Sequence, residues 1–104
     1  MSSGTRRVEF RKISQAAAAR ADAIVRRWLP DGRREGHEWV ARNPSRNDHH
    51  AGSFKINMRT GAWGDFATGD RGGDLISLAA FLFRLTQAEA AQRIADMLGI
   101  DAHG

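Results

Sequence analysis

The chain of 104 residues contains no cysteine. Disulfide bonds and thiolate metal sites are therefore both excluded. No apolar run approaches the roughly 18 residues that a membrane span needs. The first residues are polar and basic with no apolar stretch behind them, so we expect no secretory signal. A single cytoplasmic domain without membrane contact is the class that this length and composition favour.

Acidic residues are scarce in the first third of the chain. Residues 1–34 hold nine basic and three acidic side chains, a net charge of +6 in a chain whose total is +4. Such a segment favours an acidic partner, most commonly nucleic acid, although a solvated helix rich in arginine is the alternative. Residues 1–12 lack apolar periodicity and are expected to form a flexible basic arm. Residues 13–104 then form the folded domain.

Apolar spacing predicts an α+β domain in which about three helices pack on a three-stranded antiparallel sheet. The predicted helices cover residues 14–29, 75–85 and 86–98. The predicted strands cover residues 36–42, 53–59 and 62–66. Ser14, Asp74 and Thr86 are the expected helix N-caps, with Glu89 completing a capping box, and Gly99 is the expected left-handed stop. The middle helix is apolar around nearly its whole circumference, which predicts a central buried helix.

The segment from Asn43 to Leu78 contains an ordered set of short motifs. It begins N-P-S-R, continues with G-S-F-K-I, and ends G-A-W-G-D-F-A-T-G-D-R-G-G-D-L-I-S-L. This order resembles the zinc-ribbon domain at the N-terminus of bacterial and phage DNA primases. That family reads C-P-x-H, then P-S-F and a strand, then C-F-x-C, then G-G-D and a buried helix. The resemblance covers roughly residues 33–100 and implies a zinc-ribbon-like fold.

The resemblance places the four zinc-ligand positions of the family on residues of which none is cysteine or histidine, and one of which is a cation that would repel a metal. They fall on Asn43, Arg46, Asp65 and Thr68. Structural zinc takes cysteine and histidine ligands in tetrahedral geometry, so we expect a degenerate, metal-free site and no cofactor. Arg46 and Asp65 are expected to form an ion pair across it, with Asn43 and Thr68 hydrogen-bonded nearby.

Two other motifs and two tryptophans have a structural interpretation beside the functional one. Asp48-His49-His50 could bind a metal but reads better as an exposed loop, because adjacent histidines in an extended chain point apart. The segment 69–73 could cradle a phosphate at a helix N-terminus, but it lacks the lysine of a P-loop and reads better as a structural turn. Trp39 is expected in the core, whereas Trp63 could equally be buried or stack on a base.

By resemblance, the chain is a non-catalytic DNA-binding module of a primase-type replication system of a phage, plasmid or other mobile element. Its partners would be single-stranded template DNA and a primase or helicase catalytic subunit or domain. The expected nucleic-acid-binding residues are Arg26, Arg27, Arg33, Arg34, Arg42, Lys55, Arg59 and Trp63. The alternative is a protein-interaction adaptor for a primase or helicase that has lost DNA binding with the zinc. A small nuclease is disfavoured, since no acidic cluster has metal-binding spacing.

Overall fold

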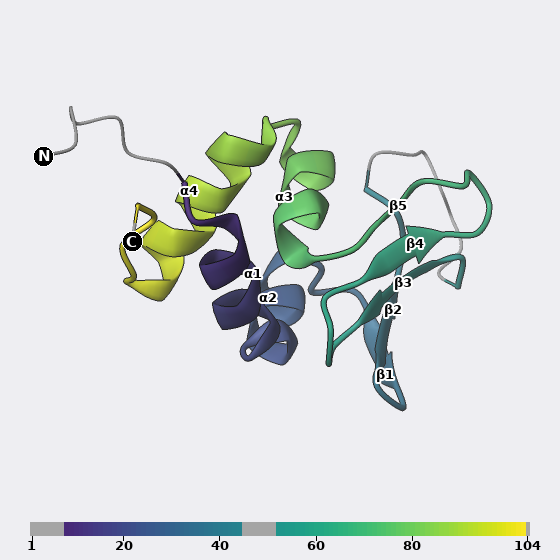
Figure 1. Ribbon diagram of the computed structural model, residues 1–104. Coiled ribbons are helices and arrows are strands. Elements are labelled where there is room, and N and C mark those ends of the chain that lie inside the picture. Colours follow the sequence, from purple (N-terminus) through teal and green to yellow (C-terminus); the bar gives the residue numbers. More distant parts are fainter. Residues whose placement is uncertain (1–7, 45–51, 104) are drawn as a thin grey trace, which may run out of the picture.

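The computed structural model describes residues 8–44 and 52–103. In this part of the chain, four helices lie on one side of a five-stranded antiparallel sheet (Figure 1). The helices are α1 (Phe10–Ala18), α2 (Ala21–Trp28), α3 (Leu75–Phe83) and α4 (Gln87–Leu98). The strands are β1 (Arg33–Glu35), β2 (Glu38–Ala41), β3 (Phe54–Asn57), β4 (Trp63–Asp65) and β5 (Arg71–Gly72). The predicted α+β class and antiparallel sheet are confirmed.

The sheet has two more strands than the three predicted. Its order is β1-β2-β3-β4-β5, so each strand pairs with its neighbour in the sequence, and the predicted strands correspond to β2, β3 and β4. The added strands form the two edges. β1 is exposed at all its positions and β5 is only two residues long. Neither shows the apolar alternation by which a half-buried strand is recognised in a sequence.

The predicted helix over residues 14–29 is in fact two helices, and it begins earlier. The N-cap is Glu9, and Ser14 lies inside α1. The Glu9 backbone N–H donates to the Ala102 carbonyl at 2.8 Å, a tertiary contact that fixes the start of the helix and that no local pattern reveals. Residues 10–12, assigned above to the basic arm, therefore belong to the folded domain.

The break between α1 and α2 falls at Arg20, whose backbone leaves helical geometry (φ −122°, ψ 23°). The alanine run over residues 16–19 gives no warning of it, because alanine has the highest helix propensity of any residue. Packing rather than propensity sets the break, since each of the two helices places its own buried residues in the core.

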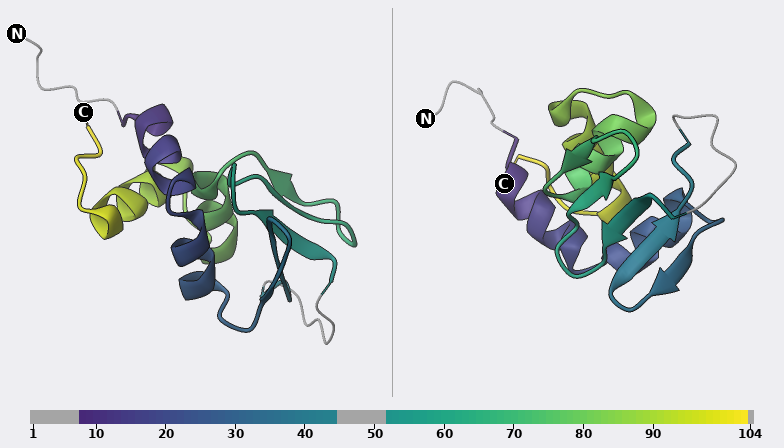
Figure 2. Two further views of the ribbon diagram at one scale, coloured as in Figure 1. Left: turned by 90° about the horizontal axis from the view of Figure 1, so that it is seen from below. Right: turned by 90° about the vertical axis from the view of Figure 1, so that its right-hand side faces the viewer.

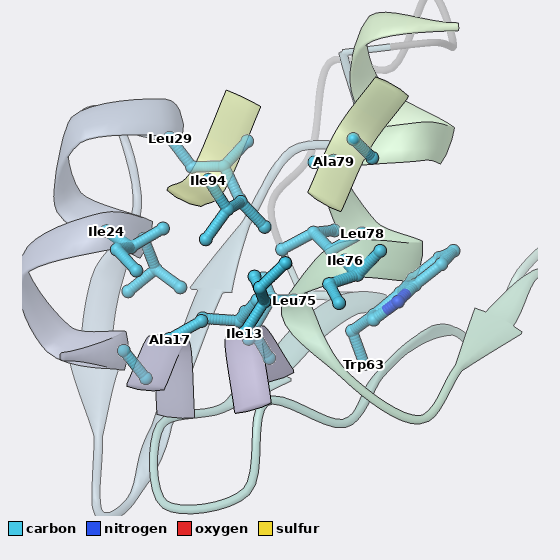
Figure 3. Close-up of a cluster of buried hydrophobic side chains, with 14 of the residues drawn as sticks. Ile13, Ala17, Ile24, Leu29, Trp63, Leu75, Ile76, Leu78, Ala79 and Ile94 are labelled. Atoms are coloured by element: carbon cyan, nitrogen blue, oxygen red, sulfur yellow. The ribbon is translucent and has the colours of Figure 1, made fainter. Parts of the chain in front are cut away.

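The core fills the space between the helices and the inner face of the sheet (Figure 3). The helices contribute large buried side chains, among them Ile13, Ile24, Leu75, Leu78 and Ile94. The inner face of the sheet contributes Trp39, Ala41, Phe54, Ile56 and Trp63. The predicted burial of Trp39 and Phe54 is confirmed, with 4% and 0% of their surface exposed.

The ends of the last two helices match the predicted capping. Asp74 and Thr86 each form a capping box, with Ser77 and Glu89 respectively, and Gly99 ends α4 with φ 70°. Each cap satisfies backbone N–H groups that have no partner within the helix. None of the helices in residues 8–44 and 52–103 is long and apolar enough to cross a membrane.

The glycine-rich segment before α3 has a structural role at Gly72. A Cβ at Gly72 would lie 2.2 Å from the Ser77 hydroxyl oxygen and 2.5 Å from the indole nitrogen of Trp63. Only glycine therefore lets β5 approach the start of α3 this closely. This close approach favours the structural-turn interpretation of the segment over a phosphate cradle.

Candidate nucleic-acid interface

The face of the sheet that points away from the helices carries a row of five residues, three of which are basic. The strands lie next to one another in the sheet (Figure 2, right). Their pairing places one residue of each strand side by side across it. The row consists of Arg33, Val40, Lys55, Gly64 and Arg71. In β2, β3 and β4 the residues that flank the row are buried. Val40, within the row, is also only 1% exposed, although it is not part of the core cluster. Because side chains alternate between the faces of a strand, the row lies on the outer face.

Gly64 forms part of the wall of a hollow of about 450 Å³ on this face, called here the Gly64 hollow. A Cβ at Gly64 would have its nearest non-neighbouring atoms 3.6 Å away, an ordinary contact distance. A side chain at position 64 would therefore fit without a steric clash, and glycine leaves that space open. Lys55, Phe66 and Arg71 stand around the hollow. Its polar lining also includes Glu38, Asn57 and Asp70.

Phe66 is the most exposed large hydrophobic side chain among the described residues, with 79% of its surface accessible. The Lys55 ammonium nitrogen lies 5.7 Å from the centroid of its ring, within cation–π range. The backbone N–H of Phe66 donates to the Ser53 carbonyl at 2.9 Å, so the chain at Phe66 is held beside β3. An exposed ring beside a cation offers a surface on which a planar base can stack.

Phe66 and Arg71 were not among the binding residues predicted from the sequence. The sequence does indicate that Phe66 is exposed. If Trp63 and Asp65 face inward, Gly64 and Phe66 face outward, because side chains alternate between the two faces of a strand. Arg71 had no such signal, because it lies in a two-residue strand within a glycine-rich segment.

Trp63 lies in the core, so burial, one of the two alternatives left open for it, is what the structure shows, and its place among the expected nucleic-acid-binding residues is not supported. Only 7% of its surface is exposed. The indole N–H donates to the Ser77 hydroxyl at 2.9 Å, and the ring centroid lies 4.8 Å from that of Phe81. Trp39 is held in the core in a similar way, because its indole N–H donates to the Leu29 carbonyl at 2.9 Å. Both indole rings pack in the core and also have their N–H group hydrogen-bonded.

The other predicted cations are exposed but do not form one continuous row. Arg42 follows β2 and Arg59 follows β3. Arg34 pairs with the inward-facing Trp39, and its guanidinium donates to the Gly36 carbonyl at 2.9 Å. They surround the sheet, whereas the row through Lys55 crosses its outer face.

Two predicted cations belong to α2. Arg26 is 2.5 Å from the Asp22 carboxylate, and its guanidinium carbon lies 4.7 Å from the Trp39 ring centroid. Arg27 lies beside Trp28 and Phe83 in the helical layer. Of the predicted set, Arg33 and Lys55 lie in the outer row, on either side of Val40. Arg33 also forms an ion pair with Glu35 at 2.7 Å.

Two of the four zinc-ligand positions meet in a buried hydrogen bond. Asn43 and Asp65 are 1% and 2% exposed, and the Asn43 amide donates to the Asp65 carboxylate at 2.8 Å. The other oxygen of that carboxylate accepts the backbone N–H of Ala67 at 2.8 Å. Thr68 is exposed, and its hydroxyl accepts the Asp70 backbone N–H at 3.3 Å. Arg46, the predicted partner of Asp65, lies outside the described residues.

This arrangement joins the ends of β2 and β4 through side chains. An amide N–H₂ group is a hydrogen-bond donor and has no lone pair for a metal. Asn43 directs this group, and not its amide oxygen, at the Asp65 carboxylate, so in this arrangement the two side chains do not share a metal ion. Across residues 8–44 and 52–103, no group of three or more His, Cys, Asp or Glu side chains could hold a metal ion. The Asp48-His49-His50 motif lies outside those ranges.

Neither a protein-family model nor a curated protein sequence matches this chain. Among solved structures, it is similar to the primase of Aquifex aeolicus, in a crystal structure containing the zinc-binding and RNA polymerase domains. The TM-score is 0.76 at 17% sequence identity, and the match covers 91% of this chain and 22% of the primase chain. The chain therefore spans about a fifth of that protein and shares the fold of this part of it.

Proposed function

We propose that the chain is a non-catalytic DNA-binding module of a primase-type replication system, and that it contacts single-stranded template DNA. The contact surface is the outer face of the sheet, centred on the Gly64 hollow. A primase or helicase catalytic subunit or domain acts beside it. The observation that carries this proposal is Phe66, an exposed ring paired with Lys55 at the edge of an open hollow.

The chemistry of the outer face suits a single strand better than a duplex. An unpaired base has a free π-face, and stacking on an aromatic ring stabilises binding by about 1–3 kcal/mol per base. Lys55 and Arg71 flank the hollow and can hold the phosphates on either side of the stacked base. The carboxylates of Glu38 and Asp70 in the lining can accept hydrogen bonds from base amino groups.

Two likenesses support the assignment to a primase system. The motif order over residues 43–78 resembles the primase zinc ribbon, and the fold is similar to part of a solved primase structure. That structure is described by its zinc-binding and RNA polymerase domains, and this chain corresponds in length to 22% of it. A binding role with catalysis supplied by a separate polypeptide or domain fits that proportion.

Fluorescence anisotropy with a labelled single-stranded oligonucleotide tests the location of the surface. Phe66→Ala should weaken binding about fivefold to a hundredfold, the equivalent of losing one stacked base. Phe10→Ala is the matched control, because Phe10 is also exposed, at 42%, but belongs to α1. Equal effects of the two substitutions would contradict the assignment of the outer face.

A second variant fills the hollow without removing a side chain. Gly64→Val places methyl groups into space where the nearest atoms lie at contact distance, so the melting temperature should change little while binding weakens. Unchanged affinity in this variant would show that the hollow does not hold a nucleotide. If the parent protein itself fails to bind DNA, the adaptor function takes the place of the proposed one.

A further inference from the structure

A second surface lies in the helical layer, separate from the outer face of the sheet. It is a groove of about 390 Å³ between α2, α3 and α4. Its floor is apolar and its rim is basic. The residues that line it are Arg27, Trp28, Ala79, Phe83, Arg93 and Met97.

The floor of this groove leaves apolar surface in water. Phe83 is 47% exposed although it ends a helix whose other apolar residues are largely buried. Its ring packs edge-on against Trp28, with centroids 5.6 Å apart and planes at 85°. This contact holds the two rings in a fixed relation and pre-forms the floor. Exposed apolar surface rimmed by polar residues is typical of a protein-interaction site.

The rim of the groove has the charge of an anion-binding surface. Arg27 and Arg93 are both exposed, and neither forms an ion pair with any other residue that the structure describes. Arg26, the neighbour of Arg27, is by contrast paired with Asp22. In addition to the hydrogen bonds of the α4 capping box, the Arg93 charge acts on Glu89 of the same helix and contributes to the lowered pKa of that carboxylate. Two guanidinium groups without a close ion pair at the rim of an apolar floor complement a segment with carboxylates on either side of an apolar anchor.

We propose that this groove binds a short acidic segment of a partner protein, with one aromatic or long aliphatic side chain inserted between Arg27 and Arg93. The anchor side chain packs on Phe83 and Met97, and aspartate or glutamate residues beside it pair with the two arginines. Nucleic acid is a poorer occupant, because the Phe83 ring is already engaged with Trp28 and the floor also contains alanine and methionine.

Phage-displayed random dodecapeptides selected on the immobilised full chain test this proposal. The selected peptides should share an aromatic or long aliphatic residue flanked by aspartate or glutamate. A synthetic copy of the strongest peptide, measured by anisotropy, should bind the Arg27→Glu/Arg93→Glu variant at least about tenfold more weakly, because both rim charges are reversed. Both arginines are exposed, so this variant should fold, and its melting curve checks that it does.

A matched variant separates this groove from the outer face of the sheet. Lys55→Glu/Arg71→Glu reverses the same number of charges and should leave peptide binding unchanged. The proposal is overturned if the selected peptides lack acidic residues, or if the two double variants weaken the peptide equally. It is also overturned if Arg27→Glu/Arg93→Glu abolishes oligonucleotide binding and leaves the peptide unaffected, since Arg27 would then belong to the nucleic-acid surface.

Discussion

Replacing Asp65 with alanine removes the acceptor of the buried hydrogen bond from Asn43. A hydrogen bond to a charged group contributes about 1.5–3 kcal/mol, and a donor left buried without its acceptor costs about 1–3 kcal/mol. The Ala67 N–H also loses its partner, but Ala67 is exposed and water can replace the carboxylate there. We therefore expect Asp65→Ala to lower the free energy of unfolding by about 2–4 kcal/mol. At about 4–8 °C per kcal/mol for a domain of this size, the melting temperature should fall by about 10 °C or more.

A double-mutant cycle isolates the contribution of the pair. Asn43→Ala, Asp65→Ala and the double variant are unfolded with urea, and the coupling between the two sites should reach about 1–3 kcal/mol. Thr68→Ala is the control, because Thr68 occupies another of the zinc-ligand positions but is exposed, and it should change stability by less than about 0.5 kcal/mol. If the coupling is below about 0.5 kcal/mol, or if Thr68→Ala destabilises as much as Asp65→Ala, the pair does not hold the two strand ends together.

Three further outcomes are expected. A chelator should leave the melting curve of the purified protein unchanged and elemental analysis should find no zinc, because Asn43, Asp65 and Thr68 replace the ligands of the zinc ribbon that the sequence resembles; one tightly bound zinc per chain would contradict this. Trp63→Phe keeps an aromatic ring but loses the hydrogen bond to Ser77 and part of the buried indole. It should therefore reduce stability by about 1–3 kcal/mol without changing oligonucleotide affinity, as urea melts and anisotropy can check. The pKa of Glu89 lies below the usual value for glutamate because its carboxylate accepts hydrogen bonds from the Thr86 backbone and side chain. The stability that these hydrogen bonds contribute is therefore present above the ordinary glutamate pKa and is lost as pH falls through the lowered pKa. An NMR titration should show the pKa of Glu89 rising in Thr86→Ala.

Local sequence patterns were sufficient for the central strands and the last two helices. In β3, Phe54 and Ile56 alternate with polar residues, and that period of two identifies both the strand and its inner face. Thr86 and Glu89 mark the start of α4, because a capping box is formed by residues three apart in the sequence. Such features depend on neighbours along the chain and can be read directly from it.

The remaining features depend on contacts between distant segments. The start of α1 is set by the Glu9–Ala102 hydrogen bond, and the edge strands exist because β2 and β4 offer free backbone groups to them. The burial of Trp63 follows from Gly72 and Ser77 closing over its indole nitrogen. Once Trp63 faces inward, Phe66 has to face outward, which is why the predicted and the observed aromatic residue of the candidate site differ.

The salt dependence of single-stranded DNA binding tests the proposed function most directly. Each phosphate contact on a single strand contributes a slope of about −0.7 to the plot of log K against log salt. Contacts from Arg33, Lys55 and Arg71 should therefore give about −2 in total. Replacing Lys55 or Arg71 with glutamine should flatten the slope by about 0.7 each, whereas Phe66→Ala should lower the affinity and leave the slope unchanged. Absence of binding at low salt and micromolar protein, or a slope that Lys55→Gln and Arg71→Gln do not alter, would contradict the account.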